Sequence, residues 1–266
     1  MTDEIVTITD SDISKAWGKV LLTAMSPGDR LRPMCVSITG FGDEGPSEVH
    51  EIREALDKLL SEDDKTFSTK ITSETIFPYT HWSRKKPSRQ ELYATYLEKF
   101  LPRYRRQTPR KKKGTYFERL INFSGYAKDS AGLIVPKSIN QLEHIITVWN
   151  HYKKIGRSPA HAKLQASCFD PNKDHDASPY LEFPCLQQVG FSYSTDGLLA
   201  VTGYYTTQYI ISRAYGNYLG LYHLGIFMAK EMGLKLSKIN CFTANPKLDR
   251  NKSSLRQLQA IVNSYI

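Results

Sequence analysis

The sequence predicts an α+β fold, with a large, twisted, mostly antiparallel sheet and helices packed on one of its faces. Two β-rich runs, 189–194 and 198–211, are separated by a turn that contains Asp196-Gly197, and an Asp-Gly pair in that place is a strong hairpin signal. The next segment, 215–232, is apolar on nearly all sides, which is typical of a helix buried under a sheet. The 266 residues, 40% of them hydrophobic, can bury a substantial core, and we expect one domain over 1–266.

Hydrophobic spacing predicts further elements before the basic segment of the chain. Residues 34–41 alternate like a strand. Ser47 can then cap a helix over 48–60, whose apolar residues recur at helical spacing. The run 68–77 also has the pattern of a strand.

The second half of the chain continues the mixed pattern. A helix is expected to begin at Ser138, because Ser-Ile-Asn-Gln makes a capping box there. Short runs predict strands at 163–169 and 236–244, and the chain is expected to end in a helix over 254–264.

A strongly basic segment follows a helix expected over 91–100, which Pro102 should end. Seven of the eleven residues from 103 to 113 are basic, and we expect a loop over 102–114. It is either a solvated connection, a phosphate or polyanion site, or a nucleic-acid contact. No helix-turn-helix, finger or RNP pattern accompanies it. The candidate anion-binding residues are Arg103, Arg105, Arg106, Lys111, Lys112 and Lys113.

The cysteines and the first residues bear on compartment and metal content. The four cysteines form no CxxC pair, so we expect reduced thiols and no metal site. The first thirty residues contain neither a secretory signal nor a membrane span, so we expect a cytoplasmic protein without membrane association. The net charge of +9 favours anionic partners.

Cys185 follows Pro184 and directly precedes the predicted hairpin. An unpaired cysteine is most often a small, buried apolar residue. A Pro-Cys dipeptide before a hairpin with an Asp-Gly turn, then a tyrosine-rich strand and a Gly-Asn pair leading into a buried helix, resembles the thymidylate synthase and deoxycytidylate hydroxymethylase superfamily. Upstream, GTYFERLINF resembles the family's GxYGxR-like element, and INQLEHIITVWNHYKKIGRSP with HAKLQASCFDPNKD is similar to its helix, loop, strand and Asx-Pro segment. The similarity covers roughly residues 114–250.

The resemblance implies a thymidylate synthase-like fold and covalent chemistry at Cys185. In the family, a thiolate at this position attacks C6 of a pyrimidine, and C5 then collects a one-carbon unit from 5,10-methylenetetrahydrofolate. A temporary covalent bond divides one difficult step into easier ones, and a thiol deprotonates readily if positive charge lowers its pKa. The alternative is that Cys185 only fills space in the core.

Other candidate site residues come from the same resemblance. Asn217 matches an asparagine that hydrogen-bonds the pyrimidine edge and favours uracil over cytosine, although asparagine is also common at helix starts. Tyr204 matches a family tyrosine or is a core residue. Trp82 could stack on a pterin or pyrimidine, or pack in the core. Arg119 is a further candidate for the pocket, and Glu91 and Glu118 are the nearest candidates for the family's catalytic glutamate.

Departures from the family pattern leave two functions open. Leu186 replaces a histidine, Thr206 the phosphate-binding arginine, and Ala162 and Lys163 the paired arginines that reach across the family's dimer. Threonine and alanine cannot replace planar arginine forks on a phosphate. The protein is therefore either an enzyme acting on an altered pyrimidine base, nucleoside or nucleotide, or an inactive binding module whose basic loop contacts an anionic or nucleic-acid partner. Since the family pairs its sheets back to back, we also expect a homodimer through 189–211.

Overall fold

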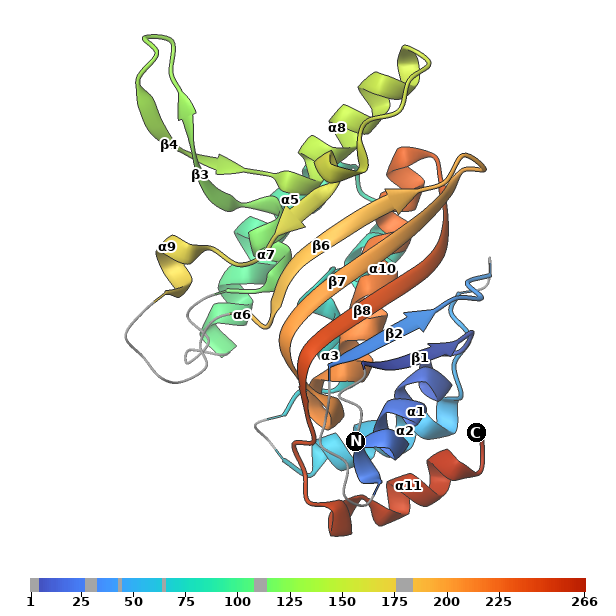
Figure 1. Cartoon of the computed structure of the whole chain (residues 1–266). Helices are drawn as coiled ribbons and strands as arrows, with labels where there is room; N and C mark the ends of the chain where they lie inside the picture. Colours follow the sequence, from blue (N-terminus) through green and yellow to red (C-terminus); the bar gives the residue numbers. More distant parts are fainter. Residues whose placement is uncertain (1–4, 27–32, 43–44, 64–65, 108–113, 176–183) are drawn as a thin grey trace.

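The computed structural model describes residues 5–26, 33–42, 45–63, 66–107, 114–175 and 184–266. The strands form a six-stranded sheet of order β1-β2-β8-β7-β6-β5 and a separate hairpin, β3-β4 (Figure 1). The strands are β1 (Val6–Asp10), β2 (Met34–Ile38), β3 (Phe123–Lys128), β4 (Ile134–Ile139), β5 (Gln165–Ser167), β6 (Leu186–Tyr193), β7 (Leu198–Tyr209) and β8 (Lys235–Lys247).

The helices occupy the connections between these strands and the C-terminal region. The α-helices are α1 (Ile13–Met25), α2 (His50–Ser61), α3 (Thr69–Glu74), α4 (Tyr79–Lys85), α5 (Arg89–Thr95), α6 (Leu101–Gln107), α7 (Tyr116–Ile121), α8 (Gln141–Lys154), α9 (Pro171–Asp174), α10 (Tyr215–Met232) and α11 (Arg256–Asn263). Two π-helical turns, η1 (Tyr96–Phe100) and η3 (Ile210–Ala214), and two 3-10 turns, η2 (His161–Lys163) and η4 (Lys252–Leu255), complete the set described.

As expected, the structure combines helices with one large sheet. This sheet is mixed, with three antiparallel and two parallel strand pairs among the described residues. The β6-β7 hairpin forms as expected, with Ser194 N–H donating to the Leu198 carbonyl at 2.9 Å. The pairs β1-β2 and β7-β8 are parallel. Each parallel pair is joined through a helix, α1 or α10, and a helical crossover returns the chain in the same direction. The predicted helix at 215–232 therefore required a parallel pair that the expected topology did not contain.

The two faces of the six-stranded sheet differ in covering. On one face Leu199, Val201 and Tyr205 of β7 are buried, and α10 packs against β7 and β8. In Figure 1 α3 and α10 lie behind the sheet, and no described helix crosses its near face. That uncovered face carries Tyr204, which is 38% exposed, and Phe242, whose ring is stacked on it at 5.7 Å.

The segment 68–77, expected to be a strand, instead contains helix α3. Ser68 caps this helix by accepting a hydrogen bond from Ile71 N–H. The helix packs closely on α10, where an added Cβ at Gly216 would lie 2.5 Å from Thr72 Cβ and one at Gly220 would lie 2.7 Å from Ile76. Burial against the glycine surface of α10 therefore outweighs the β preference of this run.

Three helix boundaries also differ from expectation. Asn140, not Ser138, caps α8, because its side chain accepts from Glu143 N–H, and Ser138 belongs to β4. Helix α2 begins at His50, and the Ser47 hydroxyl instead donates to Asp12. Pro102 does not end a helix: η1 precedes it and α6 continues to Gln107. The wider π-helical turn accommodates a residue without an N–H group.

One continuous cluster of hydrophobic residues forms the core of the described chain. None of its described helices is both long and apolar enough to cross a lipid bilayer.

His223 on α10 should make the protein sensitive to acid. Its ring stacks on Tyr79 with centroids 3.9 Å apart, and its Nδ1 has no hydrogen-bond partner among the described residues. Burial, aided by the positive charge of Arg53, lowers the pKa of His223 from 6.5 to about 3. Unfolded chains bind this proton below about pH 6.5 and the folded chain does not, so stability falls as the pH drops through this window.

We expect His223→Phe to reduce the loss of unfolding free energy between pH 7 and pH 5 by about 2 kcal/mol. Phenylalanine keeps the stacked ring but has no group to protonate. Urea denaturation at both pH values measures the effect, with the exposed His144→Gln as the matched control. Equal acid sensitivity in His223→Phe and the native chain would contradict this origin.

Candidate active site around Cys185

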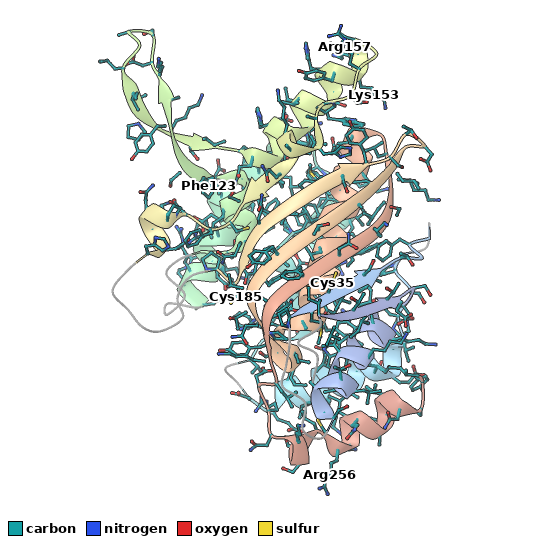
Figure 2. The ribbon with its side chains drawn as sticks, viewed as in Figure 1. Cys35, Phe123, Lys153, Arg157, Cys185 and Arg256 are labelled. Carbon is teal, nitrogen blue, oxygen red and sulfur yellow. The ribbon has the colours of Figure 1, made fainter. Side chains whose placement is uncertain are left out.

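Cys185 is half-buried and lies directly before β6 (Figure 2). Its carbonyl accepts a hydrogen bond from Thr206 N–H at 3.1 Å, which ties it to β7. The pairing of β6 with β7 shifts register between Leu186 and Gln188, so a bulge follows Cys185 immediately. Bulges re-aim side chains and are over-represented beside active sites. The cysteine therefore has a fixed backbone without being sealed in the core.

Three residues from distant segments interact electrostatically with the thiol or with one another. Tyr116 begins α7, Arg213 lies in η3, and Lys247 ends β8. The charges of Arg213 and Lys247 reach Cys185. The charges of Cys185 and Arg213 both influence the pKa of Tyr116. Sequence analysis did not identify any of the three. The only local signal was that Arg213 stands one helical turn before Asn217.

Arg213 is held by neighbours that leave its charge uncompensated. Its guanidinium carbon lies 5.2 Å from the centre of the Phe67 ring, and Nη1 lies 3.4 Å from Thr72 Oγ1. No carboxylate among the described residues forms an ion pair with Arg213 or Lys247. The two cations therefore give this end of the sheet a positive charge beside the thiol.

The thiols of the chain differ in their ionisation. Burial raises the pKa of the Cys185 thiol above its ordinary value, and the positive charges of Arg213 and Lys247 oppose that rise. Burial raises the pKa of Cys168 and of Cys241 to about 12 in each case. Burial likewise raises the pKa of Tyr116, so its hydroxyl is neutral and can donate a hydrogen bond. Cys185 is thus a protonated thiol at neutral pH, placed where cations favour its thiolate.

Asn217 is 3% exposed in the first turn of α10. It is not a helix cap, because the cap position is Ala214 and no side chain caps this helix. Within the described chain, no hydrogen bond joins the Asn217 side chain to another residue. The amide atoms are not among the fully buried polar atoms that lack a partner, so they touch solvent and could hydrogen-bond a ligand.

The other predicted substrate contacts lie elsewhere. Tyr204 is on the uncovered face of the sheet, opposite α10, and is not a core residue. Trp82 packs edge-on against Phe77 and Phe227, and Lys230 lies 5.2 Å above its ring. Lys163 is exposed in η2, with its ammonium 5.9 Å from the centre of the Tyr152 ring.

Arg119 forms a buried ion pair with Asp174 and also lines a cavity beside α7. Its two terminal nitrogens donate to the carboxylate of Asp174 at 2.6 and 2.8 Å, and Nη1 also donates to the Cys168 carbonyl at 2.8 Å. Cys168 N–H in turn donates to the Gln187 carbonyl at 2.7 Å. The ion pair therefore supports the strand that begins beside Cys185.

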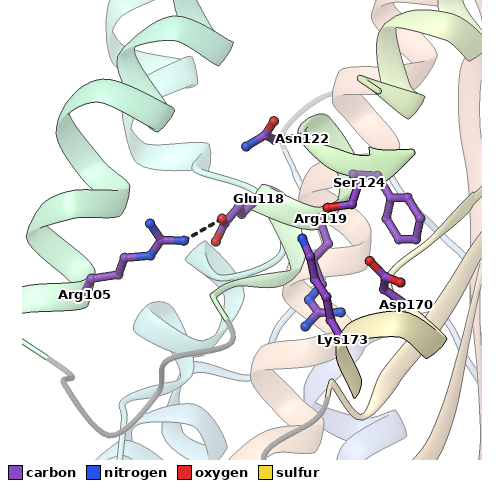
Figure 3. Close-up of a pocket in the computed structure, with 8 residues that line it drawn as sticks. Arg105, Glu118, Arg119, Asn122, Ser124, Asp170 and Lys173 are labelled. Carbon is purple, nitrogen blue, oxygen red and sulfur yellow. Dashed lines mark hydrogen bonds and ion pairs between the residues drawn. The ribbon is translucent and has the colours of Figure 1, made fainter. Parts of the chain in front are cut away.

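A cavity of about 260 Å³ lies beside α7 and is bordered by α6, β3 and α9 (Figure 3). Arg105 reaches across it and donates to Glu118 Oε1 at 2.7 Å. The second oxygen of Glu118 is buried and has no partner among the described groups. Glu91, in contrast, only completes the capping box of α5 with Ser88. The cavity is lined by Arg105, Glu118, Arg119, Asn122, Phe123, Ser124, Asp170 and Lys173.

The basic segment is not a loop throughout. Arg103, Arg105 and Arg106 lie on helix α6, because the chain remains helical through Pro102. Lys111, Lys112 and Lys113 lie outside the described residues. The predicted anion site therefore remains a prediction for this segment.

In the described part of the chain, no three His, Cys, Asp or Glu side chains are grouped so that they could hold a metal ion. Comparison with known proteins gave neither a matching family model nor a matching curated protein.

Proposed function

We propose that the protein is a transferase that acts at C5 of a pyrimidine through a covalent adduct between Cys185 and C6. The observation that carries this proposal is the position of the thiol. It is half-buried beside a strand bulge, with Arg213 and Lys247 close enough to favour its thiolate. Cys168 and Cys241 are buried, and neither thiol is influenced by two cations as Cys185 is.

Without a one-carbon donor the adduct leads only to exchange of the C5 hydrogen with water, and these steps follow from elementary pyrimidine chemistry. The Cys185 thiolate adds to C6, and the C5=C6 electron pair moves onto C5 and the C4 carbonyl oxygen. C5 takes up a proton from water. Loss of the original C5 hydrogen re-forms the enolate, which expels the thiolate and restores C5=C6. Covalent addition thus activates C5, which alone is a weak nucleophile.

Neighbouring side chains fit the two ends of such a substrate. Asn217 can donate to O4 and accept from N3–H, which favours uracil over cytosine. Arg213 and Lys247 would attract an anionic substituent, and a guanidinium can contact phosphate through two nitrogens. We therefore place a phosphorylated or otherwise anionic uracil compound ahead of the free base.

A folate fits less well with the residues present. The predicted stacking residue, Trp82, is engaged with Phe77, Phe227 and Lys230. We therefore assign only the steps performed by the protein's own residues, and derive none through methylenetetrahydrofolate.

The test is tritium release from a panel of C5-tritiated uracil and cytosine bases, nucleosides and nucleotides, without any one-carbon donor. Release to water is expected to be fastest with the anionic uracil compound. A panel that yields no release under any condition would favour the second candidate, an inactive binding module. That candidate is supported by Leu186 and Thr206, which stand where the resembled family has histidine and arginine.

We further predict a homodimer formed through the uncovered face of the sheet. Tyr204 and Phe242 form a stacked, partly exposed aromatic pair there, flanked by half-buried Cys35 on β2. Multi-angle light scattering at micromolar concentration should give twice the chain mass of 30.3 kDa. Tyr204→Lys should lower that mass, because a charge buried in the interface is costly. A native particle of 30.3 kDa would contradict the dimer.

A further inference from the structure

The excess positive charge of the chain lies in one part of it. Residues 101–175 contain 15 of the 36 lysines and arginines but only 5 of the 27 acidic residues, a net charge of +10. The rest of the chain holds the remaining 21 basic and 22 acidic residues, a net charge of −1. In Figure 1 this part carries two projections from the body, the β3-β4 hairpin and helix α8, which diverge from each other.

The hairpin is an arm with an apolar tip. The exposed fractions are 67% for Tyr126, 65% for Leu133 and 72% for Ile134. Asp129 fixes the turn, because its Oδ1 accepts from the N–H groups of Ala131 and Leu133 at 2.9 Å each. A two-stranded hairpin alone is marginally stable in water, and exposed aliphatic residues gathered at its end indicate a binding surface.

The cations of this part are accessible. Among the described residues of this part, Arg105 and Arg119 are paired with Glu118 and Asp174, whereas seven exposed cations outside α6 form no ion pair with a described carboxylate. They lie on both strands of the arm, at the C-terminal end of α8 and just after it, in η2 and on α9. These exposed cations are Lys128, Lys137, Lys153, Lys154, Arg157, Lys163 and Lys173.

The geometry points to a nucleic-acid duplex as the partner: these cations contact its phosphates, and Leu133 and Ile134 enter its minor groove as an apolar wedge. Cations spread along a bound rod each release counterions and supply the affinity. Aliphatic side chains inserted between base steps from the minor groove unstack them and bend the duplex. This inference is independent of the chemistry at Cys185.

Two other polyanionic partners fit the surface less well. A lipid surface touching the tips would leave unused the cations on the sides and base of the projections, such as Lys137 and Lys173. Single-stranded nucleic acid is held mainly by stacking on aromatic rings, and the arm exposes one aromatic ring, Tyr126, beside two aliphatic side chains.

Fluorescence anisotropy with a short labelled duplex, at a series of salt concentrations, tests the phosphate contacts. Lys128→Gln/Lys137→Gln should weaken binding about tenfold near 0.1 M salt and make the slope of log K against log salt shallower by about 1.8. The matched control is Lys58→Gln/Arg256→Gln, which removes two exposed cations from α2 and α11. Its affinity should equal that of the native chain.

A second pair of variants tests the wedge. Leu133→Ser/Ile134→Ser should weaken duplex binding without changing the salt slope, because no phosphate contact is lost. The control, Ile5→Ser/Ile71→Ser, changes two exposed isoleucines elsewhere, which are 55% and 48% exposed. All four positions are exposed, so each variant should keep its circular-dichroism spectrum.

Three results would overturn the proposal. They are absence of salt-dependent duplex binding by the native chain, equal losses in the arm and control variants, and preferential binding of the single strand or of phosphatidylserine vesicles. Tritium release is measured without nucleic acid, so failure of either proposal is distinguishable from failure of the other.

Discussion

Cys185→Ser is expected to abolish tritium release from C5-tritiated pyrimidines and to leave the fold intact. A serine hydroxyl loses its proton far less readily than a thiol at neutral pH, so addition at C6 stops. Serine is similar in size to cysteine, and a half-buried site accepts it at no more than about 1–3 kcal/mol. Scintillation counting of released tritium and a urea denaturation curve measure the two effects.

Cys35→Ser is the matched control, because Cys35 is also half-buried but lies on the uncovered face of β2. It should release tritium at the native rate. If Cys185→Ser also retained release and only stability fell, Cys185 would be a core residue and the inactive alternative would replace the enzyme.

The pH dependence of tritium release should reflect the direction in which the pKa of the Cys185 thiol is shifted. Because burial raises the pKa of Cys185 above 9.0, the thiolate fraction should still be increasing above pH 9. We expect the rate of tritium release to rise across that range in the native chain.

Arg119→Ala is expected to destabilise the protein by about 3–5 kcal/mol, because it leaves the Asp174 carboxylate buried and unpaired. The Asp174 side chain is 0% exposed and that of Arg119 is 9% exposed. The change also removes the donor to the Cys168 carbonyl. Urea denaturation at pH 7 gives the free energy of unfolding.

Two further variants make this result specific. Arg119→Met/Asp174→Leu should recover most of the lost stability, because removing both charges leaves no uncompensated ion. Lys163→Ala, an exposed position, should change stability by less than about 0.5 kcal/mol. A loss below about 1 kcal/mol in Arg119→Ala would show that Arg119 is available for a ligand, as the sequence had suggested.

Some elements were predictable because their signals are local. The Asp196-Gly197 turn fixes the β6-β7 hairpin, and the apolar run 215–232 is a buried helix whatever surrounds it. The strand predicted at 68–77 was wrong, because the helix there depends on packing against Gly216 and Gly220 of α10, which no local pattern records. The prediction that Pro102 ends a helix was also wrong, since a π-helical turn compensates for its missing N–H.

The site was harder to predict than the fold. Cys185 could be singled out by its position before a hairpin. The electrostatic influence of Arg213 and Lys247 on it depends on the tertiary fold, which no local pattern records. The β3-β4 hairpin was not predicted. None of its strand residues is buried, so its sequence lacks the hydrophobic alternation that burial of one face produces.

Covalent trapping on Cys185 tests the central claim most directly. A 5-fluoropyrimidine carries an electron-withdrawing fluorine at C5, which favours addition of the thiolate at C6. Quenching with acid prevents removal of the C5 proton, so the adduct should be preserved. Intact-mass spectrometry of the chain incubated with 5-fluorouracil, its nucleoside and its nucleotide should show the added mass of one ligand. Peptide mapping should place it on Cys185, and Cys185→Ser should show none. Absence of an adduct with all three compounds, or an adduct on Cys35, Cys168 or Cys241 instead, would contradict the assignment of Cys185 as the nucleophile.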